Sequence, residues 1–363
     1  MFRLNQRRAL VGLAACGLVL SACGGVASSS GDAVKIRVTN LLPPNNAQSD
    51  MMEWFVEELE ARTDGEVEAE ITYGGALVSG ADTLPGLQQG RAEAGNLVPA
   101  YFPAELPLNN LNMVPLPDGS QGTRVRALTQ LHDEVDIFTE EFEKNDLVLL
   151  GYLPNPSSTV AVSSELASLD DFKGKKIRVP SQPQAAVYSA LGAEPVFMAS
   201  EEVYEAVERK IVDGVSYPMD VQISNGITEV ATTLAPDVGQ SGGSIFALSK
   251  STYDKLSDDA KDVIAELRAE WAAKSDEVLA ASEAEACQTF LDEGGTLVTW
   301  TDAEKKRLEE IVNAESVDVW KDEAAKGGYD ADELDELWTT YTDAVDSLES
   351  ESDYVDVMTT CGQ

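Results

Sequence analysis

The sequence predicts an α/β protein with two lobes and a helical C-terminal region. Segments with the two-residue period of a strand alternate with segments of helical period over residues 34–98, and a second series of the same kind covers residues 147–217. Beyond residue 250 the apolar residues keep helical spacing. In folds of this class the loops at the carboxyl ends of the strands form a ligand crevice, so we expect a cleft between the lobes.

The composition excludes several functions. The 363 residues include 26 Lys and Arg against 64 Asp and Glu, a formal net charge of −38, and 43% of them are hydrophobic. A chain of this kind folds into roughly two globular domains. Nucleic acid is excluded as a partner, because binding its phosphates needs a basic face. His132 is the only histidine, which excludes a zinc site built from several histidines. We expect neither a metal nor a cofactor.

The N-terminus has the pattern of an export signal. Arg3, Arg7 and Arg8 precede an uncharged run over residues 9–20. This run is short for a membrane span of ~20 residues but suits a signal peptide. Residues 20–25, LSACGG, resemble the bacterial lipobox, which predicts a signal peptide over 1–22, a lipid on Cys23 and a flexible tether over 23–33. The alternative is a plain signal peptide with an incidental cysteine. The export route, Sec or twin-arginine, stays open.

The mature chain would be more acidic still. Without the three arginines of the signal it has 23 basic and 64 acidic residues, a net charge of −41. Anionic lipid headgroups repel such a surface, so we expect attachment to the cell membrane through the lipid anchor. Cys287 and Cys361 remain as a pair in an oxidising compartment. They are candidates for a disulfide between the C-terminal tail and a long helix; two separate thiols are the alternative.

The first lobe is expected over residues 34–153, with parts of 240–290 returning to it. Its expected strands are residues 34–39, 66–73, 93–98 and 147–153, and its expected helices are residues 49–63 and 81–90.

The second lobe is expected over residues 154–239, entered through a crossover at 154–157. Its expected strands are residues 158–163, 175–179, 195–198 and 215–217, and its expected helices are residues 183–191 and 200–210. Residues 250–363 are expected to be helical. They include a long helix over 257–291 capped by Ser257, a helix opened by the capping box of Thr301 and Glu304, and a last helix over 332–348.

Three motifs resemble catalytic, phosphate-binding or calcium-binding sequences, but each lacks a residue or an order of residues that the function requires. Residues 239–243, GQSGG, match the nucleophile elbow of α/β-hydrolases. That fold places its histidine after the serine, whereas His132 precedes Ser241, so we interpret the segment as a loop between the lobes. Residues 75–80 have P-loop glycine spacing but lack the lysine that follows. Residues 330–334 begin like a calcium loop without its ligands or glycine. We therefore expect no enzyme.

Arg178 is the strongest candidate for a binding residue. It lies at the end of a predicted strand, beside a proline, and alternates with Ile177 and Val179. If those two pack inward, Arg178 projects from the other face. A guanidinium there grips a carboxylate through two parallel hydrogen bonds. A surface arginine paired with one of the many acids is the alternative.

Several segments resemble one family of transport receptors. They are residues 58–67 (ELEARTDGEV), 86–95 (GLQQGRAEAG), 169–180 (LDDFKGKKIRVP), 190–196 (ALGAEPV), 202–214 (EVYEAVERKIVDG) and 256–261 (LSDDAK). Their order and spacing resemble the DctP-type solute-binding proteins of TRAP transporters over residues 34–348.

The resemblance implies a fold and a function. Two lobes of a periplasmic-binding-protein-like fold, joined by crossing strands and a long helix, would close over an organic acid and deliver it to membrane permease subunits driven by an ion gradient. The carboxylate-binding arginine of the family falls on Arg178. Many relatives carry a second arginine after the crossover strand, and residues 151–163 contain none. This favours a monocarboxylate, or a second carboxylate held by the neutral donors Asn155, Ser157 and Ser158.

Other pocket residues are expected on weaker grounds. The candidates are Tyr217 and Asn225, which fall in the region that lines the pocket of the family, Gln182 after the strand of Arg178, and Asn46, Asn96 and Tyr101 from the first lobe. The sequence thus predicts a monomeric, lipid-anchored extracytoplasmic receptor that captures a small organic acid without catalysis. The alternatives are an ABC-type solute-binding lipoprotein, a secreted hydrolase and an acidic adhesin.

Overall fold

The computed structural model describes residues 33–116, 121–352, 354 and 361. All of them belong to one unit, residues 33–363. The predicted signal peptide, the predicted lipidation site Cys23 and the tether up to residue 32 lie outside the described residues.

The first lobe is built on a five-stranded sheet with the order β2-β1-β3-β10-β4. β1 pairs in parallel with β2 and β3, and β10 pairs antiparallel with β3 and β4. The strands are β1 Val34–Thr39, β2 Val67–Thr72, β3 Ala94–Leu97, β4 Leu147–Tyr152 and β10 Ile245–Ser249. Its helices are α1 Ala47–Arg62, α2 Thr83–Gln88, α3 Gln121–Glu134, α4 Asp136–Lys144 and α8 Lys250–Tyr253.

The second lobe is built on a six-stranded sheet with the order β11-β9-β5-β8-β6-β7. β6 pairs in parallel with β7 and β8, and β5 pairs antiparallel with β8 and β9. The strands are β5 Ser158–Val162, β6 Lys176–Val179, β7 Glu194–Phe197, β8 Gly214–Pro218, β9 Thr233–Pro236 and β11 Thr296–Leu297. Its helices are α5 Gln182–Ala190, α6 Val203–Glu208 and α7 Met219–Ser224.

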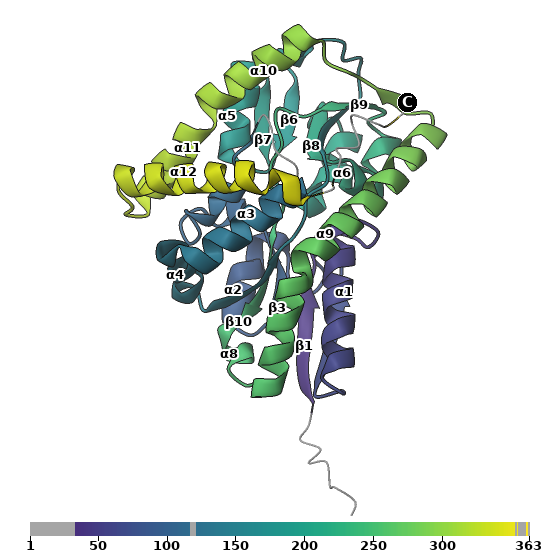
Figure 1. Cartoon of the computed structure of the whole chain (residues 1–363). Coiled ribbons are helices and arrows are strands. Elements are labelled where there is room, and N and C mark those ends of the chain that lie inside the picture. The colour runs from purple at the N-terminus through teal and green to yellow at the C-terminus, as the bar shows by residue number, and fades with distance from the viewer. Residues whose placement is uncertain (1–32, 117–120, 353, 355–360, 362–363) are drawn as a thin grey trace, which may run out of the picture. The chain divides into compact units, whose positions relative to one another are not determined.

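The helix α9 Asp258–Asp292 belongs to both lobes. It begins where the Ser257 hydroxyl accepts a hydrogen bond from the Ala260 N–H, as predicted for a capping serine. Trp271 lies in the core of the first lobe and Phe290 in a core of the second. Figure 1 shows the helix beside α1 at one end and near α6 and β9 at the other.

The C-terminal helices cover both lobes. They are α10 Asp302–Glu315, α11 Val317–Lys326 and α12 Ala331–Leu348. Leu308 of α10 packs in the core of the second lobe, whereas Trp320 of α11 and Tyr341 of α12 pack in the core of the first. The predicted capping box of Thr301 and Glu304 is present. The predicted two-lobed α/β fold with a helical C-terminus is confirmed.

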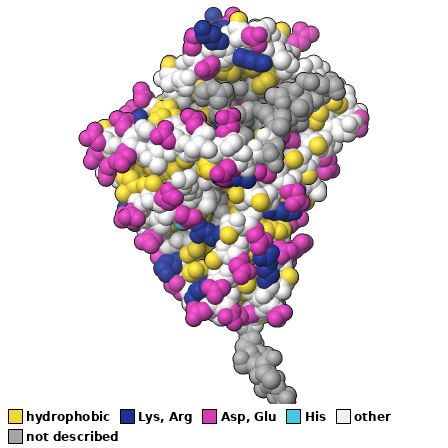
Figure 2. All heavy atoms as spheres, viewed as in Figure 1, with side chains coloured by type: hydrophobic (Ala, Val, Ile, Leu, Met, Phe, Trp, Pro, Cys, Tyr) yellow, Lys and Arg dark blue, Asp and Glu magenta, His cyan; other side chains and the backbone are white. Residues whose placement is uncertain are grey.

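The described surface is acidic and shows no feature of a membrane span or metal site. Figure 2 shows Asp and Glu side chains distributed over both lobes on the visible face. Among the described residues no helix is both long and apolar enough to cross a membrane. The same residues contain no group of His, Cys, Asp and Glu that could hold a metal ion.

Candidate functional site

A cavity of about 60 Å³ lies between the two lobes. One water molecule needs roughly 10–15 Å³ on this measure, so the cavity accommodates several waters or a small organic molecule in their place. Its lining residues come from both lobes and from the segments that connect them: Leu41, Leu42, Gln48, Val98, Tyr101, Met113, Asn155, Ser158, Arg178, Pro180, Ser200, Ser216, Tyr217, Pro218, Val221, Ser241, Gly242, Gly243 and Ser244.

Arg178 is the charged residue of the cavity wall. Ile177 and Val179 pack in the core of the second lobe, and Arg178, between them on β6, lines the cavity with 0% of the residue exposed to solvent. Its Nη1 donates to the carbonyl oxygen of Ser216 at 3.3 Å, while Nε and Nη2 donate to that of Met198 at 3.3 and 3.1 Å. The alternation of β6 turns the side chain towards the cavity, and carbonyl oxygens of β8 and of Met198, just after β7, hold the guanidinium in place.

Two tyrosines flank this guanidinium. The Tyr217 ring centroid lies 4.4 Å from Arg178 Cζ, the geometry of a cation–π contact. Arg178 Nη2 also donates to the Tyr101 hydroxyl at 3.3 Å. Burial raises the pKa of Tyr217 to about 12 against the opposing influence of the Arg178 charge. The phenol therefore stays protonated at neutral pH and donates to Ser200 Oγ.

Arg178 has no acidic partner among the described residues. None of the ion pairs found there includes it, and its hydrogen bonds all end on neutral oxygens. Removing a charge from water is costly unless an opposite charge approaches it. This wall is therefore suited to receive an anion.

A second polar part of the wall, the amide patch, consists of Gln48, Asn155, Ser241 and Ser244. Gln48 Nε2 donates to Asn155 Oδ1 at 3.1 Å, and Asn155 Nδ2 donates to the Ser241 carbonyl oxygen at 3.0 Å. Ser244 Oγ donates to Gln48 Oε1 at 2.7 Å. The patch is neutral, and none of these bonds involves the partners of Arg178.

An apolar wall completes the cavity. Leu41, Leu42 and Val98 of the first lobe pack against Val221 and Tyr217 of the second, and all five line the cavity. Tyr217 also packs against a core of the second lobe, whereas the contacts of Leu41 and Leu42 with Val221 form where the lobes meet.

The loop 239–243 lines the cavity through its last three residues. A Cβ on Gly242 would lie 1.6 Å from Asn112 Oδ1, and one on Gly243 would lie 2.1 Å from the Leu153 carbonyl oxygen. The two glycines are therefore required by close packing. Ser241 Oγ lies 3.4 Å from Ser158 Oγ, while His132 packs edge-on against Phe142. The described contacts give Ser241 no histidine base.

Five predicted site residues line the cavity: Arg178, Asn155, Ser158, Tyr217 and Tyr101.

Another five predicted site residues lie outside its lining. The Asn46 side chain caps α1 by accepting from the Ser49 N–H, and the Asn225 side chain donates to the Val221 carbonyl oxygen at the end of α7. Gln182 is exposed in the first turn of α5. Asn96 is buried and donates to Gln48 Oε1 at 3.2 Å, so it reaches the cavity only through Gln48. Ser157 is buried, with its N–H donating to Glu283 Oε1 at 2.5 Å.

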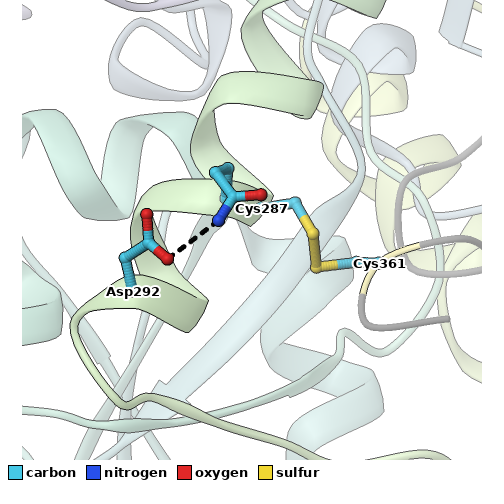
Figure 3. The surroundings of a disulfide bond; sticks show 4 residues. Cys287, Asp292 and Cys361 are labelled. Atoms are coloured by element: carbon cyan, nitrogen blue, oxygen red, sulfur yellow. Dashed lines mark hydrogen bonds between the residues drawn. A yellow bond between two sulfur atoms is a disulfide. The ribbon is translucent and has the colours of Figure 1, made fainter.

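Cys287 and Cys361 form a disulfide with a Cα–Cα distance of 5.7 Å. It joins α9 to the C-terminal end of the chain, 74 residues away in sequence, as Figure 3 shows.

Buried acids lie directly behind the cavity wall. Asp237 accepts from the hydroxyls of Ser216 and Tyr188 and from Gln184 Nε2. Burial outweighs these bonds and raises the pKa of Asp237 to about 6. Asp220, just before Val221, is also buried, and burial raises its pKa. Asp237 thus lies next to Arg178 through Ser216, whose hydroxyl bonds to the acid and whose carbonyl oxygen accepts from the guanidinium, but no hydrogen bond joins the two charged groups directly.

Asp220 joins three elements. Its Oδ2 accepts from the N–H of Ala47, the first residue of α1, and from Ser282 Oγ of α9, both at 2.8 Å. A second contact between the lobes is made by Glu201 Oε1, which accepts from the Gly80 N–H at 2.6 Å. These carboxylates hold the lobes against each other near the cavity.

Sequence reasoning missed several lining residues. Gln48 precedes the predicted start of its helix at residue 49, and α1 in fact begins at Ala47. Leu41 and Leu42 follow β1 in a segment whose apolar residues have neither helical nor strand spacing. Ser244 directly precedes β10, a strand that was not predicted. Pro180 could have been predicted to line the cavity, because it ends the KIRVP segment only two residues after Arg178.

Comparison with known proteins places these features in one family. The profile of the DctP family, described as bacterial extracellular solute-binding protein, family 7, matches residues 38–322. The chain is 24% identical to a solute-binding protein of Albidiferax ferrireducens over 75% of this chain and 80% of that protein. It is also 24% identical to the C4-dicarboxylate-binding periplasmic protein DctP of Rhodobacter capsulatus over 79% and 85% of the two chains.

A solved structure shares the fold. The sugar acid binding protein DctPAm from Advenella mimigardefordensis, in complex with galactonate, superposes with a TM-score of 0.76 at 21% identity, over 86% of this chain and 99% of that chain. With the profile match over most of its length, the chain belongs to the DctP family of extracellular solute-binding proteins, the DctP-type receptors of TRAP transporters.

Proposed function

We propose that this protein is the extracytoplasmic receptor of a TRAP transporter and captures a small organic acid by binding its carboxylate at Arg178. It would deliver the acid, unchanged, to membrane permease subunits that couple uptake to an ion gradient. The observation that supports this most is the buried guanidinium of Arg178, which lines a cavity between the lobes and has only neutral partners among the described residues.

The geometry favours a two-point grip. Arg178 Nη1 carries two N–H groups and donates to one described oxygen, and Nη2 donates to the Tyr101 hydroxyl at a long 3.3 Å. A carboxylate on this side could accept from both nitrogens in parallel. Tyr101, released as an acceptor, would be free to donate its own proton to the same carboxylate.

Lobe closure would control access. The apolar wall and the carboxylates of Asp220 and Glu201 connect the lobes around the cavity, so separating the lobes would break these contacts and open the site. Receptors of this architecture close around ligands by hinge motion. The named relatives bind C4-dicarboxylates and galactonate, which supports an organic acid as the ligand here.

The export and anchoring predictions complete the proposal. A signal peptide over residues 1–22 and a lipid on Cys23 would place the receptor, as a monomer, outside the cytoplasmic membrane next to its permease. Replacing Cys23 by serine should release the exported protein from the membrane fraction while leaving its ligand affinity unchanged.

The central test replaces Arg178 by alanine. Native mass spectrometry of the purified protein identifies the acid that it carries, and calorimetry with that acid compares the variants. Removing one partner of a buried charge pair costs about 2–5 kcal/mol, so we expect R178A to lose binding by at least about 30-fold. The variant also leaves the carbonyl oxygens of Met198 and Ser216 without a donor, so its melting temperature should fall, and circular dichroism at the temperature of the calorimetry checks that it is still folded. The control is R209A, whose side chain forms an exposed ion pair with Glu205. An R178A protein that binds the acid as well as the wild type would refute the proposal.

A further inference from the structure

We infer that the acid taken by this cavity is a monocarboxylate with an apolar body and an uncharged second end. The inference rests on the proposed function of Arg178 and adds the chemical class of the ligand.

The cavity wall carries a single charge. Among the described residues that line it, Arg178 is the one with an ionised side chain, and the remaining polar members are amides and hydroxyls. In the amide patch these groups already bond to each other: Gln48 Oε1 accepts from Ser244 Oγ and from Asn96 Nδ2, and Gln48 Nε2 donates to Asn155. Gln48 Nε2 and Asn155 Nδ2 each keep one further N–H for a neutral oxygen. The patch can bind a carbonyl or hydroxyl group but cannot neutralise a second anion.

Acidic groups lie behind the wall of the cavity. Asp220 accepts from the N–H of Ala47, the residue before Gln48, and itself precedes Val221. Asp237 accepts from Ser216, and Glu201 follows Ser200 in the chain. In a buried site of low dielectric these carboxylates repel a second negative charge on the ligand, and that charge would also lose its water without gaining a cation.

The other buried guanidinium near the cavity does not change this balance. Arg124 of α3 lies behind the loop 239–243 and donates to the carbonyl oxygens of Gln240 and Val114 and to the Tyr341 hydroxyl. It is not part of the cavity lining, and neither are the three residues that accept its hydrogen bonds.

The apolar wall selects the body of the ligand. Leu41, Leu42, Val98 and Val221 present hydrocarbon to the cavity, and Met113, Pro180 and Pro218 extend this surface. A polyhydroxylated sugar acid would place several hydroxyls against this surface without hydrogen-bond partners, which is unfavourable. An alkyl or aromatic body makes contacts that this wall can satisfy.

A series of nearly isosteric acids tests the inference by calorimetry on the wild-type protein freed of bound ligand. Succinate, succinamate and 4-methylpentanoate share one carboxylate and two methylenes and end in a second carboxylate, an amide and an isopropyl group; galactonate represents the polyhydroxylated acids. We expect 4-methylpentanoate and succinamate each to bind at least ten-fold more tightly than succinate, and 4-methylpentanoate more tightly than galactonate. Failure of both neutral-ended acids to bind, or equal or tighter binding of succinate or galactonate, overturns the inference.

The same series on R178A separates this inference from the proposed function. If succinate binds most tightly and R178A loses it, the carboxylate site stands and the inference about ligand class is wrong. If R178A binds every acid as the wild type does, the proposed function itself is wrong. As a matched change in the apolar wall, L42N should weaken 4-methylpentanoate more than succinamate, whereas L291N, at an exposed leucine on α9, should affect neither.

Discussion

Two arginines in this protein are buried to the same degree and differ in what surrounds them. Arg178 is 0% exposed and Arg124 is 1% exposed, and neither forms an ion pair with a described residue. Arg178 lines a cavity between the lobes, whereas Arg124 links the helices α3 and α12 to the loop 239–243. Burial of a cation is thus not itself a sign of ligand binding; access to a cavity distinguishes the two.

After the loss of the whole side chain in R178A, the largest effect on affinity is expected from R178K. Lysine keeps the positive charge but loses the planar fork that binds both carboxylate oxygens, so we expect affinity for the bound acid to fall by about 100-fold. Calorimetry measures it. Near-normal affinity of R178K would show that the positive charge alone binds the acid, and that bidentate hydrogen bonding by the guanidinium contributes little.

R124M should give the opposite pattern. The methionine leaves the carbonyl oxygens of Gln240 and Val114 and the Tyr341 hydroxyl without their donor. An unsatisfied buried polar group costs roughly 1–3 kcal/mol, and we expect a loss of stability in this range by urea unfolding. Affinity should fall less than in R178K. A variant of normal stability that no longer binds the acid would make Arg124 part of the site.

A buried carboxyl group, that of Asp237, lies next to Arg178 through Ser216. Its titration should make the stability of the protein depend on pH. Burial raises its pKa from 3.8 to about 6, so the folded state holds a proton that the unfolded chain releases. Its contribution to stability is full below pH 4 and is lost as pH rises towards 6, by about 2–3 kcal/mol. D237N should remove this part of the pH dependence of the urea midpoint. An unchanged slope in D237N would contradict it.

The smallest effect is expected at Asp220, which contacts both lobes without lining the cavity. D220N weakens the bond to the Ala47 N–H between the lobes, and we expect about a five-fold loss of affinity, mainly through faster dissociation. S282A removes only the bond from α9 to the same carboxylate and is the matched control. Equal losses in both variants would assign Asp220 a structural role in the second lobe alone.

Local sequence pattern predicted most of the fold. The strand at Val34–Thr39 and the capping serine Ser257 follow from alternation and capping rules, and the structure has both. The strand Ile245–Ser249 was missed because all five residues are buried, so a central strand shows no alternation. Of the helix Gln121–Glu134, the sequence indicated only the helix-like residues 130–134 around His132, and the start of the helix was not predicted.

The candidate site was predictable only in part. Arg178 follows from strand alternation and from its family resemblance, and Tyr101 and Tyr217 lie beside it. Gln48 and Ser244 meet across 196 residues of sequence, and no local pattern indicates that contact. Asn46 and Asn225 have the composition of binding residues, but their side chains bond to nearby backbone at helix ends, which is the commoner use of asparagine there.

The helix α9 has a mechanical consequence. Since Trp271 is fixed in one core and Phe290 in another, rotation of one lobe against the other must flex or slide a single 35-residue rod. Long helices bend smoothly over many residues, so any bending of α9 during such a rotation would be distributed along the helix and not concentrated at one hinge. The helix therefore contributes, together with the contacts of Asp220 and Glu201, to the angle at which the lobes stand.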